Sequence, residues 1–206
     1  MARKRLQQEA QNILGRDEAL EILSPHMDCI VGAPLAALEL FRTLTPLQLD
    51  PLRRRTKKGI LNDAAVATAI KMLDGEAGVV PNEDYEGTFL IFAGRLALRY
   101  KWIDRSDRTR NVRTKRQRQV DHQYLQLKGM ATLTWVTFGY RLDDAWEAFS
   151  QMKILCRRGD SILWHIQIDQ FSDKQVLPLE QSSPEAVVGP SVRSKINPRK
   201  KEGTNQ

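Results

Sequence analysis

Hydrophobic positions follow different periods in the two halves of the chain, and each period predicts a different kind of element. Between residues 16 and 73 they recur every three to four positions, as they do in amphipathic helices. From residue 90 to residue 168 they mostly alternate with polar positions, as they do in strands with one buried face. The pattern predicts an α+β fold in which N-terminal helices pack on the apolar face of an antiparallel sheet.

Start and stop signals divide the helical half into four segments. The signals are a cap at Asp17, a stop at Pro25, a proline in the first turn at Pro46, and a cap at Asn62 or Asp63. The predicted helical segments are Glu18–Leu23, Pro34–Leu44, Leu47–Arg55 and Ala64–Leu73.

Alternation is clearest from Leu90 to Trp102, where apolar side chains occupy every second position. Because Arg95, Arg99 and Lys101 lie between them, we expect one half-exposed strand with an apolar face and a basic face. Three further elements are predicted: a strand over Tyr124–Tyr140 bent at Gly129, a helical turn capped by Asp143-Asp144 that presents Trp146 and Phe149, and a hairpin over Met152–Ile168 that turns at Arg157–Asp160. We expect the apolar face of the hairpin to pack on the helix at 64–73.

The predicted organisation is a basic N-terminal segment at 1–15, one α+β domain at 16–171 and a tail at 172–206. Pro, Ser, Gly and Lys dominate the tail, so we expect it to be disordered, and we expect the part from Ser182 onward to be dispensable for folding. Within the domain, residues 104–121 have almost no apolar content. They are expected to form a mobile basic loop.

The positive charge of the chain is concentrated in that loop. The net charge is +7, and Arg105–Arg118 alone carries seven basic residues and one acid, or +6. Such a cluster attracts phosphate groups, whether in nucleic acid or in anionic lipid. The candidate polyanion-binding residues are Arg95, Arg99, Lys101, Arg105, Arg108, Arg110, Arg113, Lys115, Arg116 and Arg118. Trp102, beside the loop, is a candidate for a ligand contact, whereas the other tryptophans are expected in the core.

No residue pattern indicates catalysis, a metal site or a cofactor. His26, His122 and His165 are scattered, no Gly-x-Ser-x-Gly motif is present, and Cys156 alternates with core positions. The longest apolar stretch has 13 residues, against the roughly 20 that span a bilayer. We therefore expect a non-enzymatic protein, and two cysteines far apart in sequence favour a reducing compartment.

The order of elements gives one family resemblance. A helix (NDAAVATAIKML) precedes a strand (TFLIFAGRLALRY), a polar excursion, a second strand (YLQLKGMATLTWVTFGY), an acidic turn (RLDD) and a hairpin (QMKILCRRGDSILWHIQI). This layout, over residues 62–169, resembles that of rhabdovirus matrix proteins, which are also about this size and basic. The resemblance implies a virion protein of the host cytoplasm that self-associates, condenses ribonucleoprotein and binds the inner face of an anionic membrane. Many members carry a Pro-Pro-x-Tyr budding motif and a Lys-rich N-terminus. This chain has no Pro-Pro-x-Tyr and a modest basic N-terminus, so it gives no sign of that budding route.

Two other classes stay open at this point. The first is a nucleic-acid-binding regulatory or accessory protein of a virus, phage or plasmid, cytoplasmic or nuclear. The second is an enzyme whose site has no known signature. A matrix-type protein is expected to assemble and to bind liposomes, whereas a regulator is expected to form a defined nucleic-acid complex with little lipid affinity.

Overall fold

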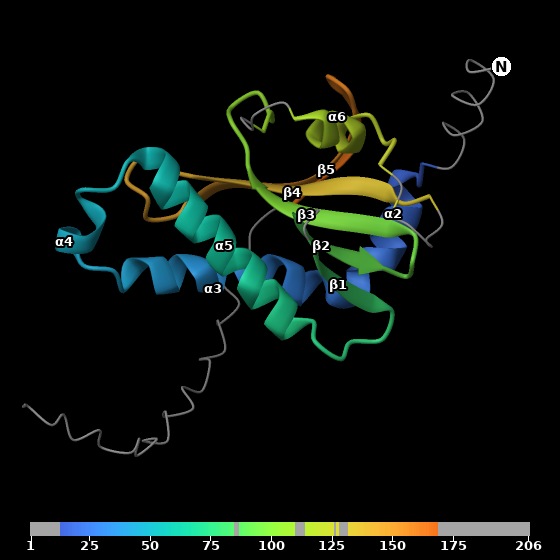
Figure 1. The fold of residues 1–206 in the computed structure, drawn as a ribbon. Helices are drawn as coiled ribbons and strands as arrows, with labels where there is room; N and C mark the ends of the chain where they lie inside the picture. The colour runs from blue at the N-terminus through green and yellow to red at the C-terminus, as the bar shows by residue number, and fades with distance from the viewer. Residues whose placement is uncertain (1–12, 85–86, 110–113, 126, 128–131, 169–206) are drawn as a thin grey trace, which may run out of the picture. The chain divides into compact units, whose positions relative to one another are not determined.

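A six-stranded sheet forms the centre of the molecule, with its strands in chain order from β1 to β6 (Figure 1). The strands are β1 (Val79–Asp84), β2 (Gly87–Phe92), β3 (Leu96–Trp102), β4 (Thr134–Leu142), β5 (Phe149–Arg158) and β6 (Ser161–Gln167). Neighbouring strands are antiparallel except β3 and β4, which are parallel. The helices and this mostly antiparallel sheet confirm the predicted α+β class.

The structure is a computed structural model that describes residues 13–84, 87–109, 114–125, 127 and 132–168. These residues all belong to one unit of the chain, Met1–Val176. The predicted N-terminal segment up to residue 12, the bend at Gly129 and the tail lie outside the described residues. The predicted limits of the domain therefore stay a prediction.

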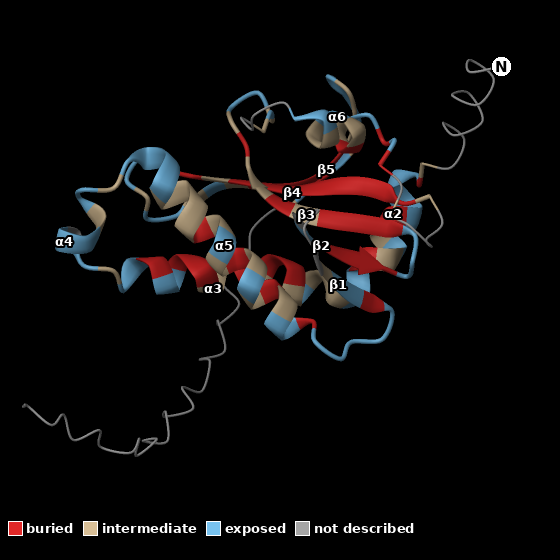
Figure 2. Ribbon diagram, viewed as in Figure 1, coloured by how far each residue is buried: buried red, intermediate tan, exposed pale blue. Residues whose placement is uncertain are grey.

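The helices are α2 (Arg16–Leu23), the 3-10 turn η2 (Ser24–His26), α3 (Met27–Arg42), α4 (Pro46–Leu49), α5 (Arg54–Met72) and α6 (Lys115–Asp121). Helices α3 and α5 pack together on one face of the sheet, and α6 lies on the other (Figure 1). The main core lies between α2, α3, α5 and the sheet, where buried residues follow the inner strands and α3 (Figure 2).

Helix α3 begins at Met27, seven residues before the predicted start at Pro34. Proline has no N–H, so Pro34 leaves the carbonyl of Ile30, four residues earlier, without its helical partner. The hydroxyl of Tyr100 on β3 donates to that carbonyl at 2.9 Å, in the buried core. A strand side chain thus replaces the missing helical hydrogen bond, and the helix continues through the proline.

Helix α5 is also longer than predicted. It runs without a break from Arg54 to Met72 and joins the two predicted segments at 47–55 and 64–73 in part. Its buried residues are Leu61, Ala65 and Ala69, which repeat every four positions. The N-cap is Arg53, so Asn62 lies inside the helix and does not cap it. Its side-chain oxygen instead accepts a hydrogen bond from the Tyr140 hydroxyl at 3.1 Å.

The strand predicted over residues 90–102 is in fact a hairpin of β2 and β3. Ala93 and Gly94 both have positive φ, at 50° and 62°, as the two central residues of a tight hairpin turn require. Phe92 pairs with Leu96 across the turn. Apolar residues therefore stay at even positions on both sides of the turn. Because the alternation continues unbroken, the sequence pattern does not reveal the turn. Strand β1, which pairs with β2, was not predicted at all.

A crossover joins β3 to its parallel neighbour β4 and places α6 on the second face. At its start Ile103 lies over Gly139, where an added Cβ would be 2.7 Å from the Ile103 side chain. Only glycine allows this close approach. The second face of β3 is partly covered by α6: Ala97 is buried, whereas Arg99 and Lys101 are half-buried.

The strand predicted over 124–140 begins only at Thr134. The helical turn predicted after Asp143-Asp144 is absent, and a loop at 143–148 joins β4 to β5.

Gln123, just before the predicted strand, is buried. Its amide bonds to backbone groups of Trp135 and Arg157, which fixes the segment after α6 to the sheet.

The hairpin of β5 and β6 is confirmed, with Gly159 at φ 62° in its turn. It is covered by a different element than predicted. Strand β6 contacts α2, and the Trp164 indole donates to the Leu14 carbonyl at 2.8 Å. Helix α5 contacts β2 and β3 instead.

Candidate anion-binding face

Among the described residues, the basic segment at 104–121 has two ordered parts, which lie on the α6 side of the sheet. The first is a turn at 104–109, tied back by a bridge between Ile103 and Thr109. The second is α6, which has Thr114 as its N-cap. The expectation of one mobile loop over 104–121 is therefore wrong for these parts. Arg110 and Arg113 lie outside the described residues.

Asp107, the single acid of the stretch Arg105–Arg118, is directed into the protein. Its carboxylate accepts from the Lys153 ammonium at 2.9 Å, and its carbonyl accepts from the Arg157 guanidinium at 2.9 Å. Both cations lie on β5, and the Lys153 side chain is only 9% exposed. Arg105 and Arg108, on either side of Asp107, are exposed. The turn thus pairs Asp107 with cations of the sheet and leaves Arg105 and Arg108 exposed, while the Asp104 carboxylate accepts from backbone N–H groups within the turn.

Helix α6 repeats this arrangement. Its last residue, Asp121, accepts from Arg99 of β3 at 3.0 Å and from the Gln117 amide at 2.7 Å. Gln117 in turn accepts from Arg99 at 3.0 Å, so the guanidinium is held on two sides. Lys115 and Arg118 are exposed on the helix.

The exposed cations of this face are Arg105, Arg108, Lys115 and Arg118, which we call the outer cations. None of their side chains forms a hydrogen bond or ion pair with another described residue. Each is left to interact with solvent or with an anionic partner. Two acids of the same elements, Asp107 and Asp121, are paired with cations of the sheet. A third, Asp104, accepts from the backbone N–H groups of Ser106 and Arg108.

A small second core holds α6 against the sheet. Val120 of α6 packs with Trp135 and with Phe89, whose ring meets the Trp135 indole edge-on at 4.9 Å between centroids. The Trp135 N–H donates to the Leu125 carbonyl at 3.0 Å. This packing fixes the position of α6, and with it the positions of Lys115 and Arg118.

Strands β2 and β3 separate at this end of the sheet. Their pairing stops at Leu90 and Leu98, and Thr88 has no partner on β3. A cavity lies on each side of the gap, about 400 Å³ toward α5 and about 140 Å³ toward α6. Thr88 and Lys101 line both cavities.

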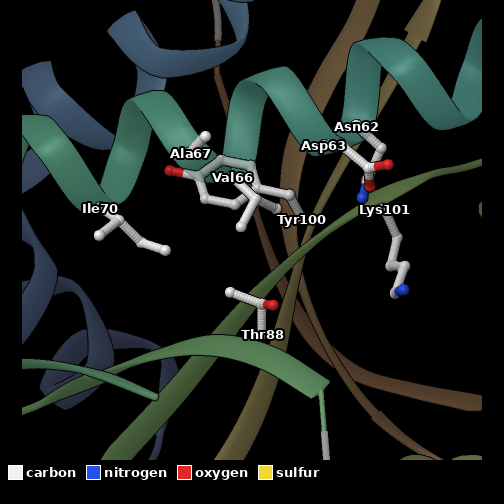
Figure 3. A pocket seen from close by; sticks show the side chains of 8 residues that line it. All are labelled: Asn62, Asp63, Val66, Ala67, Ile70, Thr88, Tyr100 and Lys101. Carbon is white, nitrogen blue, oxygen red and sulfur yellow. The ribbon is translucent and has the colours of Figure 1, made fainter. Parts of the chain in front are cut away.

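The cavity on the α5 side has an apolar wall and a polar one. Val66, Ala67 and Ile70 of α5 face Thr88 across it, and Lys101 extends along its edge with its ammonium directed away from α5 (Figure 3). Burial lowers the pKa of Lys101, and the charge of Arg99 lowers it further against the opposite effect of Asp63. Lys101 forms no hydrogen bond or ion pair with another described residue.

The smaller cavity, on the α6 side, is strongly basic. Arg99, Lys101 and Arg116 line it together with the hydroxyl residues Thr88 and Thr114, and its lining as described contains no acid. Burial lowers the pKa of Arg99, with Asp121 opposing the shift and Arg116 adding to it. The Arg99 side chain is 11% exposed, and its Nε is buried with no hydrogen-bond partner.

Two predicted contact residues lie elsewhere. Arg95 is in the β2–β3 turn, where it pairs with Glu18 of α2 at 3.2 Å. Trp102 is half-buried in an aromatic cluster, stacked on Trp146 at 5.3 Å between centroids, with the Lys58 ammonium 4.1 Å above its ring. Only Trp135 is fully buried, so the expectation of core tryptophans is confirmed for that residue.

Sequence reasoning missed the residues that organise this face. Asp107 and Asp121 were absent from the candidate set, as were Thr88, Thr114, Gln117 and Lys153. A weak signal exists in the spacing of Gln117 and Asp121, which are four residues apart on one face of a helix. The partners on β5 could not be found without the fold.

The groups considered for metal binding or catalysis do not assemble. The described residues contain no cluster of three or more metal-ligating side chains. Cys156 is buried, as expected, and burial raises its pKa to about 12, so its thiol is a poor nucleophile at neutral pH. His165 is exposed, also as expected. No helix among the described residues is long and apolar enough to cross a bilayer.

Comparison with known proteins adds no relative: no family model, no curated protein sequence and no solved structure matches this chain.

Proposed function

We propose that the protein is a non-enzymatic structural protein of the matrix type, which self-associates and links ribonucleoprotein to an anionic membrane. The observation that carries this proposal is the separation of charge on the α6 face. Asp107 in the turn and Asp121 in α6 are each paired with a cation of the sheet, whereas the outer cations Arg105, Arg108, Lys115 and Arg118 are exposed. A surface sorted in this way attracts a polyanion at every exposed position.

The chemistry of these groups suits a phosphate backbone. Arginine donates two parallel hydrogen bonds to a phosphate, and lysine contributes a point charge. Neutralising phosphates releases condensed counterions, which gives an affinity that falls steeply with salt and depends little on sequence. A packaging protein needs that kind of binding. The same outer cations also suit the alternative function, a nucleic-acid-binding regulator that does not bind lipid.

A second surface supports the membrane half of the proposal. In the connection between α3 and α5, Leu47 is 87% exposed, and Leu40 near the end of α3 is 59% exposed. Arg53, Arg54 and Arg55 follow and are exposed as well. Apolar side chains next to a basic cluster fit the interface of an anionic bilayer, where leucine enters the acyl region and arginine contacts headgroups.

The free edge of the sheet supports self-association. Strand β6 is an edge strand with no lysine, arginine, aspartate or glutamate, and Ile162 and Leu163 on it are 39% and 45% exposed. Such edges pair readily with another strand unless charge or proline blocks them.

Sedimentation with vesicles tests the proposal directly. The full chain is mixed with neutral or anionic vesicles, with and without single-stranded RNA, at two salt concentrations. We expect the protein to pellet with anionic but not neutral vesicles, and to carry RNA into the pellet at low salt. RNA binding with no pelleting on anionic vesicles would contradict the matrix proposal and support the regulator.

A further inference from the structure

The larger cavity, of about 400 Å³ between α5 and the gap in the sheet, has a charged end and an apolar end. Asn62, Asp63 and Lys101 lie at one end (Figure 3). Val66 and Ile70 extend the lining away from that end, and both are only half-buried, so the apolar wall is partly open to solvent. Sites for small organic ligands have volumes of roughly 300–1,000 Å³. The cavity therefore suits a small molecule with one polar and one apolar end.

The charged end holds one anion and one cation that do not bond to each other. Asp63 lies on α5, whereas the Lys101 ammonium is directed away from that helix (Figure 3). Neither side chain forms a hydrogen bond or ion pair with another described residue. Asp63 acts on Lys101 only at longer range, where its charge opposes the lowering of the Lys101 pKa by burial and by Arg99. The two charges thus balance, but they are held apart.

Two uncharged side chains add hydrogen-bonding groups to this end. The Asn62 oxygen accepts from the Tyr140 hydroxyl at 3.1 Å, which orients the amide and leaves its NH₂ group to donate. Thr88, across the cavity from α5, is exposed and presents its hydroxyl beside Lys101 (Figure 3). Ammonium, amide and hydroxyl groups can all donate to a carboxylate, and the Asp63 carboxylate can accept from an ammonium.

This arrangement of charges favours a zwitterion over a simple ion. An anion alone would be attracted by Lys101 and repelled by Asp63, and a cation alone would meet the reverse. A zwitterion gains both attractions at once. An α-amino acid carries its ammonium and its carboxylate on one carbon, so an apolar side chain placed over Val66 and Ile70 leaves both charges at the polar end.

We propose that the cavity between Asp63, Lys101 and the apolar wall at Val66 and Ile70 is a binding site for a free α-amino acid with an apolar side chain. The ligand carboxylate is bound by Lys101 and by the Thr88 hydroxyl, and the ligand ammonium is bound by Asp63. This inference goes beyond the proposed function and does not rest on it, because none of the outer cations lines the cavity.

The test is calorimetric titration and thermal unfolding of the full chain with L-leucine. Two analogues each lack one charge: leucinamide has no carboxylate, and isocaproate has no ammonium. We expect a saturable heat and a saturable rise in melting temperature with leucine. Both analogues are expected to bind about tenfold or more weakly, because each loses one charge-assisted hydrogen bond.

Variants of the cavity test the same contacts from the side of the protein. Asp63→Asn and Lys101→Met remove one charge each, and Ala67→Trp places a bulky side chain in the cavity. Lys71→Met, which is exposed on α5 and outside the lining, is the matched control. We expect about tenfold or more weaker leucine binding for the three cavity variants and unchanged binding for the control. Since Asp63 is exposed and asparagine has nearly its shape, Asp63→Asn keeps the test decisive even if a bulkier change prevents folding.

Three results would overturn the proposal. They are a leucine response that does not saturate, equal binding of leucine and both analogues, and an equal loss in Lys71→Met and the cavity variants. Equal binding of the analogues would reduce the cavity to an apolar contact, as for a side chain of a partner protein. RNA and vesicle binding of Asp63→Asn are expected to match wild type. If RNA and vesicle binding fail in the wild type while leucine binding holds, the proposed function is wrong and this site stands.

Discussion

The two faces of the central sheet differ in what their side chains do, although the same strands supply both. On the side of α2, α3 and α5, strand β3 contributes Leu96, Leu98 and Tyr100 to a large core. On the α6 side it contributes Ala97 to a small core, followed by Arg99 and Lys101. One face provides the free energy of folding through apolar burial, and the other places cations where they can meet an anion. The difference shows that a strand with a perfect alternation can build a core and a binding face at once.

The largest expected effect is on the helical face. Leu98→Ala removes a fully buried side chain from the main core and is expected to destabilise the protein by ~3–5 kcal/mol. Val120→Ala, in the small core under α6, removes less volume and leaves β1–β6 packed on the other helices. We expect ~1 kcal/mol there, as for a modest truncation. Chemical denaturation measures both, and equal losses would contradict the division between the faces.

The next effect is on the α6 face. Asp121→Ala leaves the Arg99 guanidinium with an unpaired charge and removes the contact between α6 and β3, at an expected cost of ~2–3 kcal/mol. Hydrogen exchange is expected to show faster exchange in α6 and no change in α3 or α5. As a control, Asp17→Ala removes an exposed ion pair with Arg16 and is expected to change little. Uniform loss of protection across the molecule would show that the two faces are not separable.

A smaller effect is expected at the hydrogen bond that joins α3 to the sheet. Tyr100→Phe keeps the ring in the core but leaves the Ile30 carbonyl without a partner, because Pro34 has already removed the helical donor. We expect a loss of ~1–2 kcal/mol. The double change with Pro34→Ala restores a backbone donor and is expected to recover part of that loss. No recovery would contradict the proposed role of the hydroxyl.

The smallest effect concerns alkaline pH, and it belongs to the helical face. Burial raises the pKa of Cys156 from 9.0 to about 12, and burial also raises the pKa of Tyr100 and Tyr140. The folded protein therefore retains protons that the unfolded chain releases, so stability falls as pH rises above about 9. Cys156→Ala is expected to flatten the first part of that fall. An unchanged profile between pH 9 and pH 10 would contradict the burial of the thiol.

The sequence was sufficient where the signal is local. The fold class and the β5–β6 hairpin follow from periodicity and a Gly-Asp turn, and the exposed cations follow from composition. It failed where a partner lies far along the chain. Helix α3 passes through Pro34 because of Tyr100, 70 residues beyond the Ile30 carbonyl. The turn at 104–109 is ordered because Asp107 meets Lys153, 46 residues away.

The candidate site was predictable in its composition and not in its arrangement. A run of basic residues indicates affinity for anions, but it does not reveal which cations are paired. Arg99 was expected on the exposed basic face and is instead held by Asp121. The cavity depends on the end of pairing between β2 and β3 at Leu90 and Leu98. The sequence could not predict it, because the turn at Ala93-Gly94 was hidden and the two strands were taken as one.

The salt dependence of RNA binding tests the central claim most directly. The four outer cations are changed to glutamine together (R105Q/R108Q/K115Q/R118Q) and compared with a variant of equal net charge altered on other surfaces (R16Q/R42Q/K71Q/R95Q). For single-stranded RNA, removing one phosphate-binding cation is expected to reduce the slope of log affinity against log salt by about 0.7. The account predicts a clearly flatter slope for the first variant and a slope near wild type for the second. Equal slopes for the two variants would show that total charge, and not the α6 face, determines binding.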